Sequence, residues 1–122
     1  MHKTILVVDD EEDVRSLIKL GLEMAAGWQV LTANSGQEAL NVATTQQPDI
    51  ILLDMMMPDL DGKETIQKLK ANSPTKDIPV ILMTAKIASS LEETLAGLDI
   101  AAIFTKPLRP LQLPKQILDA LK

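Results

Sequence analysis

The sequence predicts an α/β fold in which helices cover both faces of a parallel β-sheet. Short apolar runs such as Ile50-Ile51-Leu52-Leu53 are typical of strands that are buried on both faces. These runs alternate with helix-like segments, and strict alternation implies right-handed crossovers between parallel strands. We expect five strands, at about residues 4–9, 28–33, 49–54, 79–84 and 101–105. We expect five helices, at about residues 12–25, 35–46, 62–72, 88–97 and 110–121.

The first strand and the first helix follow from two apolar patterns. The run Ile5-Leu6-Val7-Val8 predicts a strand that ends at the acidic pair Asp9-Asp10. Leu20 and Met24 lie beside the core stripe of the helix and widen its apolar face. The expected core stripe of that helix consists of Val14, Leu17, Ile18, Gly21, Leu22 and Ala25.

Capping and turn residues define the later elements. Trp28 opens the second strand and is expected in the core or at its rim. Ser35 is the expected N-cap of the second helix, with Glu38 completing a capping box. Asp61 begins the third helix in the same way. Pro79 suits the first residue of the fourth strand, where its missing N–H does little harm.

The composition predicts one domain over residues 1–122 with an aliphatic core. Domains commonly hold about 100–150 residues, and 46% of this chain is hydrophobic. The only aromatic side chains are Trp28 and Phe104. The core must therefore be built from Leu, Ile, Val, Met and Ala.

Charge and residue content exclude several classes of function. The net charge of −5 and the pI of about 4.7 argue against nonspecific nucleic-acid binding, which needs a basic surface. The chain has no cysteine and a single histidine, His2, so thiolate sites, histidine metal sites and a Ser-His-Asp triad are excluded. No apolar run approaches the roughly 20 residues that span a bilayer, and no signal-peptide pattern is present. We expect a cytoplasmic protein without membrane contact.

Polar side chains follow four of the predicted strands. Asp9 and Asp10 follow the first, Asp54 ends the third, Thr84 ends the fourth and Lys106 follows the fifth. These strand ends meet at the edge where open parallel sheets bind ligands. Clustered carboxylates repel one another unless a cation binds, and Mg²⁺ suits a site of few carboxylates and phosphate oxygens. With Lys106 and Thr84 the set fits phosphoryl transfer, in which Asp54 would form an aspartyl phosphate.

Five short motifs occur in one order along the chain and resemble the receiver domain of two-component response regulators. None is specific alone, but their common order at matching strand ends is strong evidence, and the resemblance covers essentially the whole chain. It implies a flavodoxin-like (βα)5 fold with helices on both faces of a five-stranded parallel sheet in the order 2-1-3-4-5. The motifs are Asp9-Asp10, Asp54 with Pro58, Asp61-Gly62, Thr84-Ala85 and Lys106-Pro107.

The resemblance also implies a reaction and its residues. Asp54 would accept a phosphoryl group, with Mg²⁺ present, from a phosphohistidine on a histidine kinase or a histidine-phosphotransfer protein. Thr84 and Lys106 would contact the phosphoryl group, and the Lys106-Pro107 peptide would be cis. The implied metal ligands are Asp10 directly, Asp9 mostly through water, Asp54, and the main-chain carbonyl of Met56. The downstream partner remains unspecified.

Two rival functions are weighed against this one. A Mg²⁺-dependent phosphohydrolase that forms an aspartyl phosphate commonly carries a second Asp two residues after the nucleophile, and here that position is Met56. An inert interaction module of the same fold would not need all five site residues. We therefore expect a phosphoacceptor signalling module, not an enzyme, that loses its phosphoryl group slowly.

Three features keep more than one interpretation. The triplet Met55-Met56-Met57 is either an adaptable binding surface or, as we favour, an apolar loop that partly covers the site. The first helix either packs between the sheet and the last helix or also docks a helical phosphotransfer partner. Ile103 stands where the family often has a switching aromatic residue, and Phe104 would point to the opposite face.

Overall fold

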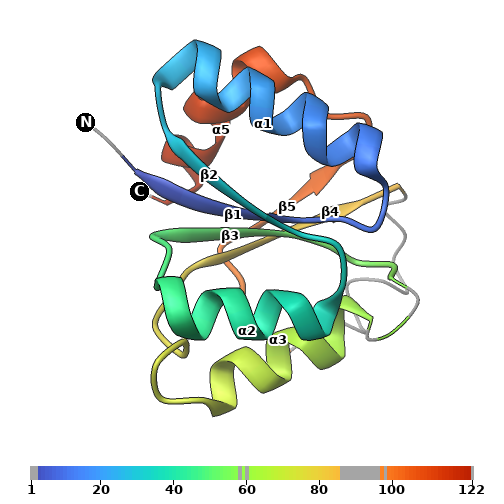
Figure 1. Cartoon of the computed structure of the whole chain (residues 1–122), viewed down its shortest axis with the longest axis vertical. Coiled ribbons are helices and arrows are strands. Elements are labelled where there is room, and N and C mark those ends of the chain that lie inside the picture. The colour runs from blue at the N-terminus through green and yellow to red at the C-terminus, as the bar shows by residue number, and fades with distance from the viewer. Residues whose placement is uncertain (1–2, 58, 60, 86–96, 98, 122) are drawn as a thin grey trace.

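The computed structural model confirms a parallel sheet of five strands with helices on both faces (Figure 1). It describes residues 3–57, 59, 61–85, 97 and 99–121. The strands are β1 (Thr4–Val8), β2 (Gln29–Ala33), β3 (Ile50–Asp54), β4 (Val80–Thr84) and β5 (Ala102–Thr105). The helical elements are α1 (Glu12–Ala26), α2 (Gly36–Gln46), α3 (Gly62–Ala71), η1 (Pro110–Gln112) and α5 (Leu113–Ala120).

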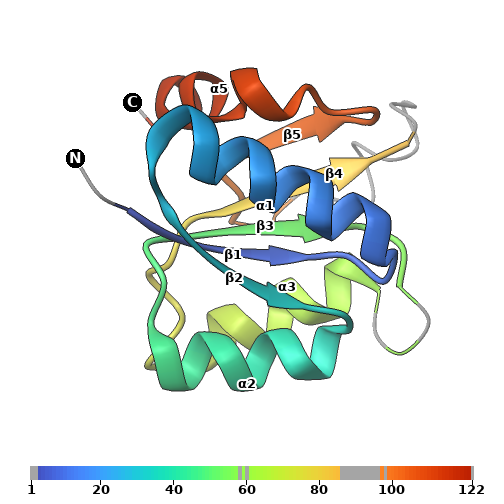
Figure 2. The same ribbon diagram turned by 45° about the horizontal axis from the view of Figure 1, so that its top comes forward.

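The strand order is β2-β1-β3-β4-β5, and every neighbouring pair is parallel. Figures 1 and 2 show α1 and α5 on one face of the sheet and α2 and α3 on the other. The helix expected at residues 88–97 lies, apart from residue 97, outside the described residues. Because β1, β3 and β4 are neighbouring parallel strands, their carboxyl ends lie side by side, as the sequence predicted.

The core is aliphatic and is divided by the sheet into two layers, because successive side chains of a strand point to opposite faces. Leu6, Val8 and Leu53 pack toward α2 and α3, whereas Ile5 and Leu52 pack toward α1 and α5. Trp28, at 4% exposure just before β2, belongs to the second layer, so the expected core position is confirmed.

Helix α1 differs from the expected pattern at its outer edge. Ile18, Gly21 and Leu22 are buried as expected, but Leu17 and Ala25 are exposed, so the predicted stripe was too wide. A Cβ atom on Gly21 would lie 2.3 Å from the Cβ of Pro110. The approach of η1 to α1 therefore depends on glycine, and this contact belongs to the expected packing of the first helix against the last helical segment.

The last helix is divided, where the sequence predicted one helix over 110–121. A 3₁₀ turn at Pro110–Gln112 precedes α5, and the amide of Leu113 donates to the carbonyl of Pro110. A single α-helix starting at Pro110 would need the amide of residue 114 to donate to that carbonyl. Residue 114 is proline and has no N–H, so the α-helix begins later.

The capping of α2 is confirmed with one difference in its bonding. The Ser35 side chain accepts a hydrogen bond from the Glu38 amide at 3.1 Å. The Glu38 carboxylate accepts from the amide of Asn34, not from that of Ser35 as in the standard capping box. Asp61 caps α3 as expected, accepting from the Glu64 amide at 2.8 Å.

Candidate functional site

The predicted strand-end carboxylates do converge. Asp9, Asp10 and Asp54 each offer a carboxylate oxygen, and these three oxygens lie within 4.8 Å of one another. Asp9 and Asp54 are buried, at 0% and 5% exposure, whereas Asp10 is exposed. The cluster thus has two buried members and one member that faces solvent.

Lys106 lies between the two buried carboxylates. Its Nζ atom is 2.8 Å from Asp9 Oδ2 and 3.4 Å from Asp54 Oδ2. The β5 strand ends at Thr105, and the amide of Lys106 donates to the carbonyl of Thr84 on β4 at 2.7 Å. The Lys106-Pro107 peptide is cis, as the family resemblance implied.

The two oxygens of Asp9 are both engaged within the protein. Oδ1 accepts a hydrogen bond from the Glu11 amide at 2.9 Å, and Oδ2 accepts from Lys106. This arrangement suits the expected role of Asp9 as a ligand that acts through water, since exposed Asp10 is the carboxylate that solvent and a cation reach freely. Asp54 Oδ1 accepts a weaker bond, 3.3 Å, from the Met56 amide.

Burial and charge set the protonation of the site. Burial raises the pKa of Asp54 above its ordinary value, the neighbouring Asp9 carboxylate raises it further, and Lys106 only partly offsets both. Burial alone would lower the pKa of Lys106, but its hydrogen bond to Asp9 and the charges of Asp54 and Asp9 outweigh burial and raise it. Lys106 therefore stays charged, but its charge does not fully offset the effects of burial and of Asp9 on Asp54.

The donor set fits a hard divalent cation. It consists of oxygen atoms only, and burial together with the neighbouring Asp9 carboxylate raises the pKa of Asp54, so a bound cation would stabilise its charged form. Mg²⁺ prefers oxygen ligands and retains several waters, which the exposed side of Asp10 permits.

The methionine triplet is divided between core and surface. Met55 and Met57 are buried in the layer facing α2 and α3, and Met56 is 73% exposed. Met55 and Met57 are therefore core residues, and the interpretation of the triplet as a loop that partly covers the site stays a prediction. Met56 is the side chain that points away from the core beside Asp54.

Arg15 is a site residue that the sequence analysis missed. From the first turns of α1, its Nη1 atom donates to the main-chain carbonyl of Asp9 at 2.6 Å. The bond holds the acidic loop against α1. Its spacing, six residues after Asp9 and one turn after Glu11, is a signal that could have indicated this contact.

Thr84 ends β4 at the same edge and is buried, with Thr105 of β5 as its sheet partner. Ile103 packs in the layer facing α3, and Phe104 packs in the layer facing α1 and α5. The expectation that these two side chains point to opposite faces is confirmed. Lys86 and Pro58 lie outside the described residues.

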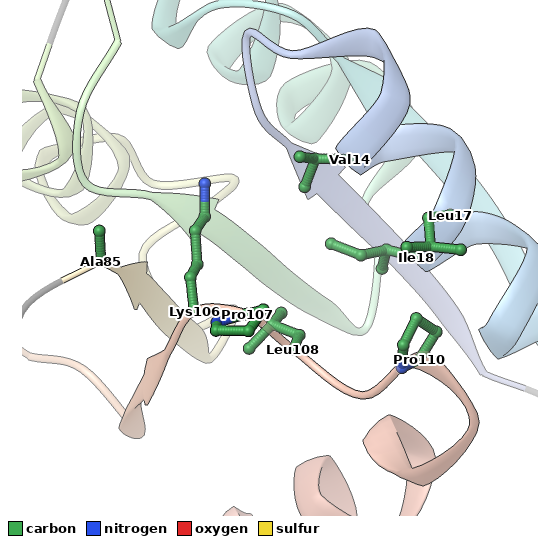
Figure 3. A pocket seen from close by; sticks show the side chains of 8 residues that line it. All are labelled: Val14, Leu17, Ile18, Ala85, Lys106, Pro107, Leu108 and Pro110. Atoms are coloured by element: carbon green, nitrogen blue, oxygen red, sulfur yellow. The ribbon is translucent and has the colours of Figure 1, made fainter.

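An apolar cavity of about 370 Å³ adjoins the site at Lys106 (Figure 3). It lies between α1 and the segment that follows β5. Its lining residues are Val14, Leu17, Ile18, Ala85, Lys106, Pro107, Leu108 and Pro110.

Beyond this cavity, the outer face of α1 and η1 carries exposed apolar side chains. Leu17, Leu20, Met24 and Leu111 are each between 54% and 69% exposed. The inner face of α1 packs on the sheet and contacts α5. The interpretation that the first helix packs between the sheet and the last helix therefore holds for this inner face alone. The exposed strip is what the docking interpretation requires.

Comparison with known protein families gives one match that spans the chain. Residues 5–118 match the model of the response regulator receiver domain. The phosphate regulon transcriptional regulatory protein PhoB of Pseudomonas aeruginosa is 42% identical over 113 residues, which are 91% of this chain and 48% of that protein. The alkaline phosphatase synthesis regulator PhoP of Bacillus subtilis is 41% identical over 112 residues, or 90% of this chain and 45% of that protein. The chain thus spans about half the length of the curated relatives it matches.

Solved structures show the same fold over almost the whole chain. The chemotaxis response regulator CheY4 of Vibrio cholerae aligns with a TM-score of 0.89 at 27% identity, covering 98% of this chain and 99% of that one. The N-terminal domain of a response regulator receiver protein from Methanoculleus marisnigri aligns with a TM-score of 0.79 at 37% identity, covering 98% and 96%.

Proposed function

The chain belongs to the response regulator receiver domain family, and we propose that its Asp54 accepts a phosphoryl group from a phosphohistidine. One observation supports the assignment above the others. Lys106 Nζ lies between Asp9 and Asp54, beside an exposed Asp10, so cationic and anionic groups surround one carboxylate at a strand end. The proposal takes residues 1–122 as one receiver domain and retains the predicted cytoplasmic location.

In the proposed step an Asp54 Oδ atom attacks the phosphorus atom of the phosphohistidine. An O–P bond forms, the N–P bond breaks, and its electron pair returns to the imidazole, which takes a proton from solvent. Lys106 and Thr84 are assigned to the phosphoryl oxygens, where a cation and a hydroxyl donor stabilise negative charge. The raised pKa of Lys106 keeps it charged in the metal-free site before the phosphodonor arrives.

Mg²⁺, when bound, neutralises charge on the carboxylates and the phosphoryl oxygens. Asp10 and Asp54 are assigned as direct ligands, with the Met56 carbonyl as the third protein ligand. Asp9 is assigned to a bound water, because its two oxygens already accept from Glu11 and Lys106.

The phosphodonor is proposed to be a histidine kinase or a histidine-phosphotransfer protein that presents a helix. The exposed strip on α1 and η1 is continuous with the apolar cavity at Lys106, through Leu17 and Pro110. A helix laid on this strip would place its histidine near Asp54. A helix-in-groove contact of this kind is read through apolar anchors at helical spacing.

The proposal covers the receiver domain and not the activity of any longer protein. Several relatives are named transcriptional regulators, and each is about twice the length of the matched region. The expectation of no nucleic-acid binding concerns only these 122 residues, whose net charge is −5. Among the described residues, no helix is both long and apolar enough to cross a membrane.

Acetyl phosphate and Mg²⁺, followed by intact mass, test the phosphoacceptor. The wild type should gain one phosphoryl group that persists, and Asp54→Asn should gain none, because the amide is nearly isosteric but not a comparable nucleophile. Asp49→Asn is the matched control. Asp49 lies just before the other end of β3, accepts a bond from the Thr4 amide, and should leave labelling unchanged.

The same experiment separates the rivals. Rapid turnover of acetyl phosphate without a lasting adduct would favour a phosphohydrolase, and no adduct or turnover would favour an inert module. Labelling of Asp54→Asn at the wild-type rate would remove Asp54 from the site.

A further inference from the structure

Asp59, in the loop between β3 and α3, is bonded to a helix on another part of the chain. Its Oδ1 atom accepts from the Gly36 amide at 3.0 Å, and its Oδ2 atom accepts from the Gln37 amide at 3.0 Å. Both amides belong to the first turn of α2. One carboxylate thus joins a loop to a helix that lies more than twenty residues earlier.

The contact completes the N-terminus of α2. The first amides of a helix have no partner within it and favour negative charge. The Ser35 hydroxyl takes the Glu38 amide, and Asp59 takes the amides of Gly36 and Gln37. Two groups therefore cap the same helix, one local and one from the β3–α3 loop.

The loop that carries Asp59 also carries the Met56 carbonyl, the assigned third ligand of the cation. Near β3 this loop is held by three bonds. The Met55 amide donates to the carbonyl of Met83, the Met56 amide donates weakly to Asp54 Oδ1, and the Gly62 amide donates to the carbonyl of Met55. Asp59 supplies an anchor farther along the loop, beyond Met56. Without this anchor, the cation would have to order more of the loop on binding, at a cost in binding free energy.

We propose that Asp59 is a positioning residue for the phosphoryl site, acting by fixing the β3–α3 loop to the N-terminus of α2. The inference rests on the proposed function, since it concerns the same site. Binding and positioning are reciprocal, so Mg²⁺ binding should also be sensed at the amides of Gly36 and Gln37.

The test compares two variants that each remove a cap from α2. Asp59→Ala removes the cap that comes from the loop, and Ser35→Ala removes the local cap and does not alter the loop. Asp59→Asn, which keeps a carbonyl oxygen, is a milder version in case Asp59→Ala folds poorly. Circular dichroism and thermal melts without Mg²⁺ establish that each variant is folded.

Two readouts are taken on the apo and titrated proteins. Mg²⁺ affinity is measured by calorimetry at low and at high salt, because loss of the Asp59 charge alone would weaken binding only where charges are poorly screened. Hydrogen exchange of the Met56 amide is measured without metal. Acetyl phosphate labelling is recorded alongside.

Asp59→Ala should weaken Mg²⁺ binding by about 10-fold at both salt concentrations, as expected when a group that orients a ligand is lost. The Met56 amide should exchange faster. Asp59→Asn should fall between Asp59→Ala and wild type, and Ser35→Ala should change affinity by less than about 2-fold, since it leaves the loop in place.

Equal effects of Asp59→Ala and Ser35→Ala on Mg²⁺ affinity would overturn the inference and leave Asp59 as a helix cap only. An effect that disappears at high salt would overturn it in favour of simple charge attraction. Wild-type protein that binds Mg²⁺ and is labelled keeps the proposed function intact in either case. Wild-type protein that binds no Mg²⁺ would overturn the proposed function and this inference together.

Discussion

Lys106 is predicted to act as a resident cation that Mg²⁺ partly replaces, and Lys106→Met tests this directly. The substitution introduces an apolar side chain of similar length and removes the positive charge between Asp9 and Asp54. Asp9 is fully buried, and the Lys106 side chain is 21% exposed. The metal-free variant should therefore retain two close carboxylates with no cation between them.

The magnitude follows from burial. Removing one partner of a fully buried ion pair costs about 3–5 kcal/mol. Lys106 is partly exposed and the cluster opens to solvent at Asp10, so we expect a loss of about 2 kcal/mol in the free energy of unfolding. With a denaturant slope of about 1–3 kcal/mol per molar urea, the unfolding midpoint should fall by about 1 M.

Mg²⁺ should reverse much of this loss. In the wild type the cation must compete with Lys106 for Asp9 and Asp54, whereas in Lys106→Met it relieves unopposed repulsion. We expect Mg²⁺ to bind about 5- to 10-fold more tightly to the variant, or about 1–1.4 kcal/mol. Urea unfolding at zero and at saturating Mg²⁺ measures both quantities, and Lys19→Met, an exposed lysine of α1, is the control.

The reasoning would be refuted by metal-free Lys106→Met that is as stable as the wild type. It would also be refuted by a Mg²⁺-induced stabilisation smaller than that of the wild type. In either case Lys106 would not be the group that balances the charge of the carboxylates.

Three further predictions concern the same cluster. Asp10→Ala should weaken Mg²⁺ binding more than Asp9→Ala, because Asp10 is exposed whereas both oxygens of Asp9 already accept hydrogen bonds from Glu11 and Lys106. Equal increases in melting temperature on adding Mg²⁺ to Asp10→Ala and to the wild type would contradict this. The pKa of Asp54 is higher in the folded than in the unfolded protein, so the folded state binds its proton more tightly and this carboxylate destabilises the protein above its folded pKa. As the pH falls through the folded pKa, this destabilisation should be relieved, so the urea midpoint of the metal-free wild type should rise. The urea midpoint of metal-free Asp54→Asn should not show this rise. Urea midpoints of the two proteins that change with pH in parallel would refute the prediction. Replacing Met56 with Asn and Lys86 with Glu should speed loss of the phosphoryl group, because neither native residue type is a carboxylate or amide that could orient an attacking water. An unchanged decay by intact mass would count against the idea.

The sequence alone was sufficient for the strands and for the residues gathered at their ends. Apolar runs that end in Asp9-Asp10, Asp54 and Thr84 carry their own signal, since a strand buried on both faces must be apolar until it reaches the edge. Parallel order then brings those ends together without any knowledge of side-chain contacts. Caps such as Ser35 and Asp61 were predictable for the same reason, because the partner of each lies within three residues.

Contacts between distant segments were decided only by the tertiary structure. The exposure of Leu17 could not be predicted from helical spacing, because η1 contacts α1 at Gly21 and leaves Leu17 uncovered. The sequence shows that Pro114 has no N–H, but this interrupts the last helix only because the helical segment begins at Pro110, whose carbonyl the amide of residue 114 would bond in an α-helix. Spacing along one helix says which residues share a face, but not how far a neighbouring segment covers that face.

The pairing of Lys106 with Asp9 and the bonds of Asp59 to α2 belong to the same class. Hydrogen bonds and close ion pairs need atoms within about 3 Å of each other. The order and register of strands, in contrast, place side chains only to within several ångströms. The sequence therefore determined which groups share an edge of the sheet. The tertiary structure decided which of those groups touch, because only packing brings atoms to bonding distance.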